Sequence, residues 1–338
     1  MRTFLPENLS IKNWVQIETY FEDLNTRAID SVEDLKKWMQ DRSELEAVLE
    51  ENMAWRYIKM NIDTTDPELQ KSFQFFVQNI SPNIAPYEHG LNTKLMNSKH
   101  LKDLDSAYYF IYLRDIKNAI YLYREENIPL RTELTKLGQQ YEEICGSMMV
   151  TFDGEEKTMQ QMGKYLQVTN RETREGAWRA VWERRSKDAD KIDDLYGKML
   201  SIRHEIAINA GFENYRDYAF VAKHRFDYTP VDCEDFHAAA EQVCVPLGRI
   251  LDKQRKDLLE VNTLRPWDLG VDVYARPPLK PFNNVDEMVE GTSKMFHKIS
   301  NELGSMFDSL RDGKSLDLDS RKGKAPGGYQ ISFDRIRR

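Results

Sequence analysis

The chain has 338 residues, of which 31% are charged and 41% hydrophobic, and its net charge at pH 7 is −8. This balance is typical of a folded chain with one large or two modest domains, and it argues against a disordered one. Basic residues are interspersed with acidic ones, and no apolar run approaches the roughly 20 residues that span a bilayer. Neither nucleic acid nor a membrane is therefore an expected partner.

The N-terminus and the cysteines bear on where the chain works. The first seven residues turn polar at once and lack the apolar core of a signal peptide. The three cysteines, Cys145, Cys233 and Cys244, form no Cys-x-x-Cys motif and no paired framework. A reduced, cytoplasmic location is therefore expected.

The first hundred residues show helical patterns. Apolar residues at three- and four-residue steps predict helices over 14–24 and 35–39, and a further helix that begins at a Ser43 cap. Residues 66–68 (Asp-Pro-Glu) predict a helix start, because proline suits the first turn and acids face the helix dipole. Residues 81–83 (Ser-Pro-Asn) end that helix.

The middle of the chain combines a long helical stretch with the one strong hairpin signal. Helical periodicity runs over 103–144, and Pro129 is expected to divide it into two helices. Its aromatic face over 108–123 is more typical of core packing than of a peptide channel. Within 148–157, the Asp153-Gly154 pair flanked by strand-forming residues predicts a tight β-hairpin.

Most of the second half also reads as helix. Asn170 is a predicted N-cap, and a helix over 189–210 is expected to end at Gly211. Three further segments follow: a helix over 232–262, an ordered proline-rich loop over 265–282 and a helix over 285–310. Residues 331–338 are compatible with an edge strand, so the predicted fold class is mainly α, with one small hairpin and a strand near the C-terminus.

Three motifs occur in the order found in a known family. A helix–Gly-Phe–Asn-Tyr–helix element spans 203–218, a Trp-Asp-Leu loop lies within 264–269, and Gly-Lys-x-x-Gly-Gly-Tyr spans 323–329. Together they resemble the oligoendopeptidase F branch of the thimet-oligopeptidase-like zinc metallopeptidases. The resemblance implies a multi-helix, ellipsoidal fold with a deep channel that admits short peptides and excludes folded proteins.

The zinc chemistry of that family has no counterpart in these residues. The family holds zinc through two histidines of a His-Glu-x-x-His helix and a downstream glutamate, and the glutamate of the motif activates water. No His-Glu-x-x-His occurs in the 338 residues. The resemblance therefore implies zinc in the parent enzyme, but no metal ligand and no catalytic residue is predicted in this chain. The substrate-channel candidates are Gly327, Gly328 and Tyr329, at the approach to the missing helix.

Two local patterns suggest metal binding but are better explained otherwise. His204-Glu205 would need a second ligand four residues after the histidine, where Ile208 stands. A solvent-facing or hydrogen-bonded helix histidine is the preferred interpretation. A second helix carries four potential ligands on one face: Glu234, His237, Glu241 and Cys244. A bundle iron site requires another Glu-x-x-His, so a polar face with a local ion pair is favoured.

Two functional hypotheses follow. In the first, 1–145 is a helical domain, and 146–338 is a hairpin plus the first part of a helical peptidase domain truncated before the zinc site. The parent then hydrolyses short peptides by metal-activated water, and this chain alone is inactive. In the second, the chain is a non-catalytic helical peptide-binding or scaffold protein that a partner completes. Loss of the C-terminal lobe is expected to expose apolar surface that promotes self-association, whereas a monomeric chain would favour a self-sufficient module.

Overall fold

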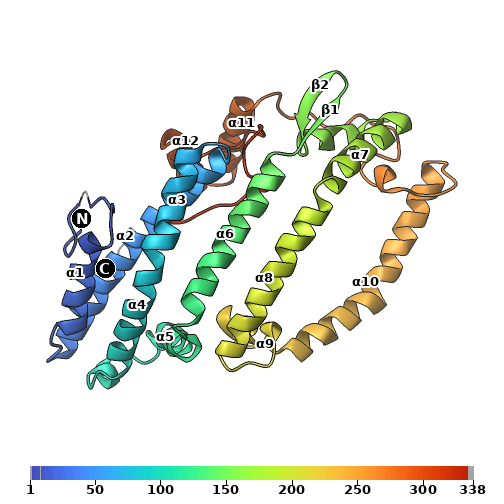
Figure 1. The fold of residues 1–338 in the computed structure, drawn as a ribbon. Coiled ribbons are helices and arrows are strands. Elements are labelled where there is room, and N and C mark those ends of the chain that lie inside the picture. Colours follow the sequence, from blue (N-terminus) through green and yellow to red (C-terminus); the bar gives the residue numbers. More distant parts are fainter. Residues whose placement is uncertain (1, 8, 334–338) are drawn as a thin grey trace. The chain divides into compact units, whose positions relative to one another are not determined.

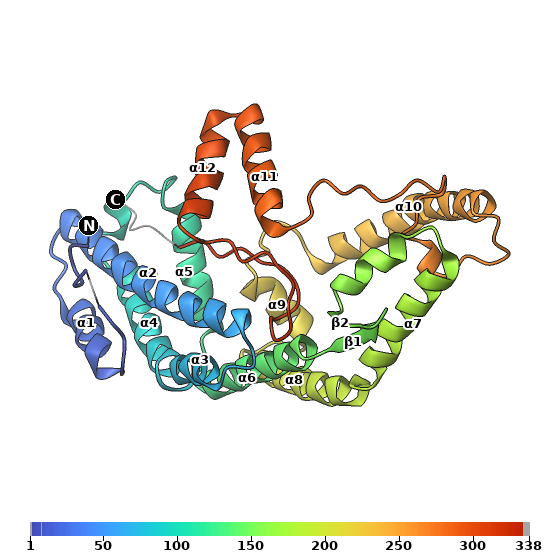
Figure 2. The same ribbon diagram turned by 90° about the horizontal axis from the view of Figure 1, so that it is seen from above.

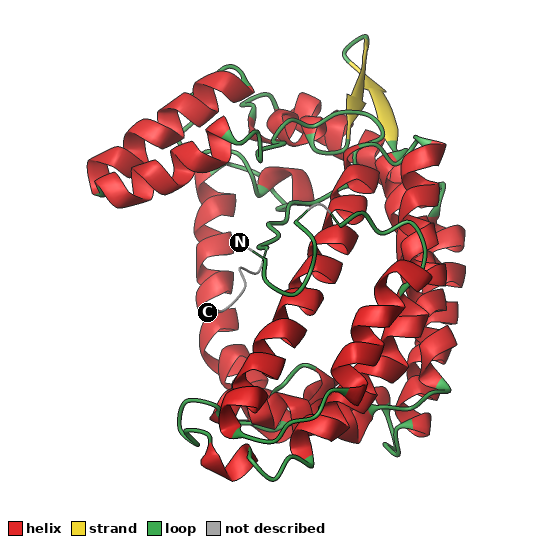
Figure 3. Ribbon diagram, turned by 90° about the vertical axis from the view of Figure 1, so that its left-hand side faces the viewer, coloured by secondary structure: helices red, strands yellow, loops and turns green. Residues whose placement is uncertain are grey.

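The computed structural model describes residues 2–7 and 9–333. Over these residues the chain forms twelve α-helices, three short 3-10 segments and one two-stranded antiparallel sheet. Figure 3 shows the hairpin in yellow among the red helices. The prediction of a mainly α fold with one small hairpin is confirmed. Among the described residues, no helix is long and apolar enough to cross a membrane.

The chain divides into two compact units, which are described separately. Unit 1 consists of the residues up to Cys145, of Asp190–Ala238 and of the described residues from Ala325 onward. Unit 2 consists of Gly146–Ala189 and Ala239–Lys324. Each unit is therefore built from segments that are far apart in the sequence. The continuous domains predicted from the sequence, 1–145 and 146–338, stay a prediction.

Unit 1 consists mainly of helices (Figure 1), the first five of which surround one large apolar core. Its helices are α1 (Val15–Thr26), α2 (Val32–Ile62), α3 (Pro67–Asn79), α4 (Ser81–Met96), α5 (Phe110–Leu122), α6 (Asn127–Gly146), α8 (Ala189–Asn209) and α9 (Tyr215–Ala222). Phe21, Leu35, Trp38 and Ile80 are fully or almost fully buried in this core. A second, smaller cluster joins the end of α5 to α6, α8 and α9 around Leu122.

The helix starts of unit 1 follow cap chemistry, with one correction. The Asp66 side chain accepts the backbone N–H of Glu68 at 2.8 Å, so the predicted start of α3 is confirmed. The predicted cap at Ser43 is wrong, because α2 continues through that residue and is capped instead by Ser31. Since neither proline nor glycine interrupts α2, a serine within it does not end the helix.

The stretch over 103–144 also divides differently from the prediction. The break between α5 and α6 lies at residues 123–126, and Pro129 falls in the first turn of α6, where its missing N–H is tolerated. The aromatic face of this stretch is only partly core. Tyr109 and Tyr112 pack against the large apolar cluster, whereas Tyr108 is exposed.

Unit 2 begins with the predicted hairpin. Strands β1 (Met149–Phe152) and β2 (Glu155–Thr158) pair antiparallel, with Met149 opposite Thr158. Asp153 and Gly154 have φ values of 55° and 76°, which a two-residue hairpin turn of the primed type requires. The hairpin packs on α7 (Arg171–Ser186), whose N-cap is Asn170 as predicted.

Three further helices follow in chain order: α10 (Pro230–Leu258), α11 (Val285–Ile299) and α12 (Asn301–Asp312). The boundary between the two units falls within α10. The single helix predicted over 285–310 is interrupted at Ser300, whose backbone is extended and whose hydroxyl accepts the N–H of Glu302 at 3.1 Å. The proline-rich stretch before α11 is a loop, as predicted.

The strand predicted over 331–338 is absent from the part of it that the structure describes. Residues 331–333 belong to no strand, and residues 334–338 lie outside the described part of the chain. The 3-10 segments are Leu101–Asp103, Gln161–Gln167 and Pro266–Asp268.

Candidate functional site

The three substrate-channel candidates lie in a segment that packs on α2 within unit 1. We define residues 325–333 as the C-terminal segment; its chain is drawn in dark red in Figure 2. The backbone N–H of Ala325 donates to the carbonyl of Asn61 at 2.9 Å. The Asn61 amide then donates to the Tyr329 hydroxyl at 3.4 Å. Because Asn61 belongs to the last turn of α2, the segment is held at the end of that helix.

Aromatic contacts extend this packing along α2. The rings of Tyr57 and Tyr329 lie 5.6 Å apart, and those of Trp55 and Phe333 lie 5.3 Å apart. Aromatic pairs at such distances contribute about 0.5–1.5 kcal/mol each beyond the area that they bury. The segment is therefore anchored on α2 by its backbone at Ala325 and by side chains at Tyr329 and Phe333.

A short polar network lies beneath the segment. The Tyr57 hydroxyl donates to Oε1 of Glu142, on α6, at 2.9 Å. The second carboxyl oxygen of Glu142 and the side-chain oxygen of Asn61 are buried without a hydrogen-bond partner among the described residues. The network therefore links α6, α2 and the C-terminal segment, and it retains two acceptors that a donor could still satisfy.

Burial sets the protonation of this network. Burial raises the pKa of Tyr57, and the nearby negative charge of Glu142 raises it further, whereas the hydrogen bond with Asn61 lowers it. Burial also raises the pKa of Glu142, although the hydrogen bond from Tyr57 opposes this. Tyr57 therefore remains a hydrogen-bond donor at neutral pH, and the network holds the segment in position rather than activating a nucleophile.

One of the two glycines gives the segment a backbone conformation that other residues tolerate poorly. Gly327 has a φ of +94°, in the region that favours glycine, and no atom lies within 4 Å of a Cβ built on it. Gly328 is exposed, and Tyr329 is 53% exposed despite its contacts with α2. The three residues are thus brought together on one surface, and their contact with a substrate stays a prediction.

The Trp-Asp-Leu motif forms a buried charge clamp in unit 2. Asp268 is fully buried and accepts two hydrogen bonds from Arg171, at 2.9 and 2.8 Å, and one from Arg174 at 3.1 Å. The backbone N–H of Arg265 adds a fourth, at 3.0 Å. These hydrogen bonds outweigh the effect of burial and lower the pKa of Asp268. The motif therefore ties the loop to α7 and has a structural role.

The helix–Gly-Phe–Asn-Tyr–helix motif joins α8 to α9 in unit 1. Gly211 has a φ of +87° and ends α8, as predicted. Arg124 donates to the backbone carbonyls of Asn209 and Ala210, at 2.9 and 3.2 Å, and so satisfies the end of that helix. Asn214 caps α9 by accepting the N–H of Asp217. This motif also builds the fold.

The donor groups of the described residues do not fit a zinc site. No three histidine, cysteine, aspartate or glutamate side chains in 2–7 and 9–333 come together as a metal would require. His204 and His237 are both exposed on their helices. Glu234 instead faces Arg216 of α9 at 3.4 Å, so its ion pair joins two helices and is not the local pair expected on that helix face.

Sequence reasoning missed the residues that receive the C-terminal segment, which are Tyr57, Asn61 and Glu142. Asn61 is buried beside the apolar Met60, and a polar residue at such a position of a helix is the only local signal. Its partner Tyr329 lies 268 residues away along the chain. No spacing rule connects positions so distant.

Family models match most of the chain. Residues 4–123 match the peptidase M3 N-terminal domain, and residues 164–335, just over half of the chain, match peptidase family M3. The chain therefore belongs to peptidase family M3. No curated protein matches it.

Solved structures show the same fold. A Bacillus anthracis protein assigned to oligoendopeptidase F superposes with a TM-score of 0.88 at 23% identity, over 97% of this chain and 61% of its own. A second protein assigned to oligoendopeptidase F gives 0.89 at 21%, and PZ peptidase A with an inhibitor gives 0.89 at 22%. Each of these two alignments covers 97% of this chain and 58% of the other. The chain thus spans about three fifths of the length of these proteins.

Proposed function

We propose that this chain is the N-terminal part of a zinc-dependent oligoendopeptidase that hydrolyses short peptides by metal-activated water, and that these residues alone are inactive. The observation that carries the proposal is the match of 164–335 to peptidase family M3 in a chain without His-Glu-x-x-His. The similarity in fold to solved oligoendopeptidases supports it. Zinc belongs to the parent enzyme in this account, because the described residues offer no ligand set.

The role of the chain in that enzyme is to present the substrate. The C-terminal segment exposes Gly327, Gly328 and Tyr329 while its other side is anchored on α2. Backbone that is exposed on one side and held on the other can pair with an extended peptide. Three free cysteines among the described residues support the proposed cytoplasmic location.

A second candidate is a non-catalytic helical protein that binds peptides or awaits a partner. The observation that favours it is the apolar surface of α10, on which Val243, Leu247 and Leu251 are all more than half exposed. Surfaces of this kind mark protein–protein contacts. Binding of a peptide would be common to both candidates, whereas turnover belongs to the zinc enzyme alone.

Peptide binding tests the proposed role of the C-terminal segment. A fluorescent hexapeptide with both ends blocked is titrated into the chain and followed by anisotropy. Tyr329→Ala is expected to weaken binding several-fold, because the aromatic contact with Tyr57 that orders the segment is lost. The matched control Tyr274→Ala removes an exposed tyrosine of unit 2 and should leave binding unchanged. Equal binding by both variants would overturn the assignment.

A further inference from the structure

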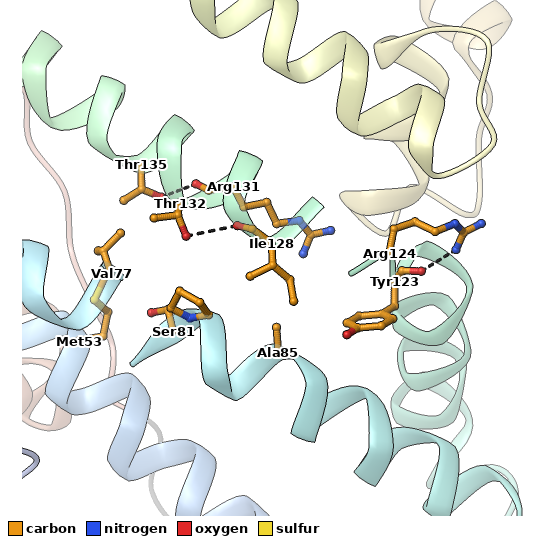
Figure 4. A pocket seen from close by; sticks show the side chains of 11 residues that line it. Met53, Val77, Ser81, Ala85, Tyr123, Arg124, Ile128, Arg131, Thr132 and Thr135 are labelled. Atoms are coloured by element: carbon orange, nitrogen blue, oxygen red, sulfur yellow. Dashed lines mark hydrogen bonds between the residues drawn. The ribbon is translucent and has the colours of Figure 1, made fainter. Parts of the chain in front are cut away.

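Unit 1 contains a pocket that none of the motifs explains. Its volume is about 210 Å³, and its apolar wall comes from four helices: Met53 on α2, Val77 on α3, Ala85 on α4 and Ile128 on α6. Figure 4 shows these side chains turned toward one another, with Val77 beside Met53. Since pockets for drug-sized ligands hold roughly 300–1,000 Å³, this one suits a smaller molecule with an aliphatic group.

Two arginines line one end of the pocket, and they differ in how many hydrogen bonds they already donate. Arg124 donates hydrogen bonds to four backbone carbonyls, those of Tyr121, Tyr123, Asn209 and Ala210. Arg131 donates one hydrogen bond from Nη2, to the Tyr218 hydroxyl at 3.0 Å, and forms no ion pair with another described residue. In Figure 4 its guanidinium extends past Ile128 toward the end where Arg124 lies. Arg131 therefore has further guanidinium N–H groups that can donate hydrogen bonds to an anion.

No side chain that lines the pocket is acidic. Glu88 interacts electrostatically with Arg131, but burial and the nearby charge of Glu46 raise its pKa to about 7. Glu88 is therefore only about half ionised at neutral pH. Glu46 is itself paired with Arg42 at 2.6 Å. Arg131 therefore interacts with a carboxyl group, that of Glu88, which carries only part of a negative charge at neutral pH.

We propose that this pocket binds a small carboxylate with a short aliphatic side chain. The carboxylate accepts hydrogen bonds from Arg131, and the aliphatic group lies against Met53, Ala85 and Ile128. Two sources share this chemistry: the C-terminal residue of a short peptide and a free aliphatic acid. The proposal does not depend on peptide hydrolysis, and it uses no residue of the C-terminal segment.

Calorimetry with a matched pair of ligands tests the charge requirement. N-acetyl-leucine carries the carboxylate, and N-acetyl-leucinamide has nearly the same shape without the charge. The acid is expected to bind about tenfold more tightly, because a charged hydrogen bond to an exposed arginine contributes at the lower end of its range. Equal affinity for the two ligands, or no binding of either at 10 mM, would overturn the proposal.

Variants test the site itself. Arg131→Gln should abolish the preference for the acid, and Ala85→Leu should block the pocket without changing its charge. Tyr218→Phe keeps the guanidinium and should change affinity less than about threefold, while Arg179→Gln on α7 should change nothing. Thermal melting confirms that each variant is folded. Undiminished binding by either Arg131→Gln or Ala85→Leu contradicts the proposal.

A third ligand separates the two sources. 4-Methylpentanoate has the carboxylate and the aliphatic chain but no peptide group. Equal affinity for this acid and N-acetyl-leucine supports a free acid as the ligand, and a clear preference for N-acetyl-leucine assigns the pocket to a peptide end. The peptide-binding assay of the C-terminal segment uses a peptide with a blocked carboxylate, so the two proposals fail independently.

Discussion

The helices around the unit 1 core and the last three helices differ sharply in what they bury. In α1 and α2, Phe21, Leu24 and Trp38 are almost completely inaccessible to solvent. By contrast, α10 has 29 residues and none of them is buried, and α11 and α12 each bury a single small residue. Apolar side chains such as Leu251 and Ile299, 65% and 72% exposed, face solvent instead.

This difference shows that similar helical patterns can have different sources of stability. Burial contributes roughly 25 cal/mol for each Å² of apolar surface, so the unit 1 core stabilises its helices directly. Isolated helices are marginal in water, and α10 to α12 gain little from burial. Their apolar faces are the surface expected to associate with other copies or partners. Unit 2 relies more on local anchors, of which the Asp268 clamp is the clearest.

The largest expected effect on stability comes from a substitution in the Asp268 clamp. Asp268→Asn removes the charge that Arg174, itself almost fully buried, faces at 3.1 Å. Breaking a buried ion pair in this way costs about 3–5 kcal/mol. Hydrogen exchange of α7 and of the loop at Arg265 should therefore rise steeply. Exchange no faster than in the wild type would contradict a clamp role.

The same residue predicts a pH dependence. Because the folded-state pKa of Asp268 is lowered, its contribution is present above the unfolded pKa of about 3.9 and is lost as pH falls through the folded value. Protection of α7 in the wild type should decline in acid, and Asp268→Asn should flatten that decline.

A matched pair of leucines sharpens the contrast between the two regions. Leu24→Ala in α1 removes a fully buried side chain and should lower the free energy of unfolding by about 2–5 kcal/mol. Leu251→Ala in α10 removes an exposed one and should change it by less than about 0.5 kcal/mol. Urea unfolding measures both. Similar losses for the two variants would mean that the α10 face is covered in solution.

A half-buried acid of unit 1, Glu88 on α4, gives the next effect on stability. Burial raises the pKa of Glu88 to about 7, well above its unfolded value, so the folded protein holds a proton that the unfolded chain releases. Stability should fall as pH rises from about 4.5 to 7 and then level off, by roughly 3 kcal/mol at most. Glu88→Gln should remove this decline. A wild-type profile that is flat between pH 5 and 7 would contradict it.

The last prediction concerns self-association of the chain, and its expected effect on stability is the smallest. Replacing Leu247 and Leu251 by lysine places two charges on one exposed face of α10 and should shift the chain toward the monomer in sedimentation experiments. Glu205→Lys on α8 changes the net charge equally at an exposed polar site and is the control. A wild-type chain that sediments only as a monomer would count against association through this face.

Local chemistry made several elements predictable from the sequence. Asp66 and Asn170 are side-chain caps, Gly211 ends a helix with a positive φ, and Asp153-Gly154 forms the hairpin turn. In each case the residue type and its immediate neighbours decide the conformation. The family resemblance rested on motifs of the same local kind.

The remaining features depend on tertiary contacts. Ser43 resembled a cap, yet it lies inside α2, and its neighbour Glu44 is buried and accepts the backbone N–H groups of Thr3, Phe4 and Leu5. The hydrogen bond between Asn61 and Tyr329 joins residues that lie 268 positions apart in the sequence, so no local pattern could predict it. The pocket at Arg131 likewise arises only where four helices meet.

The most direct test of the central claim is turnover of a quenched fluorescent peptide by the 338-residue chain in the presence of zinc, with and without a chelator. We predict no cleavage above the buffer control under either condition, because the described residues hold no ligand set for the metal. Zinc-dependent cleavage that the chelator abolishes would contradict the account and would require a catalytic centre within this chain.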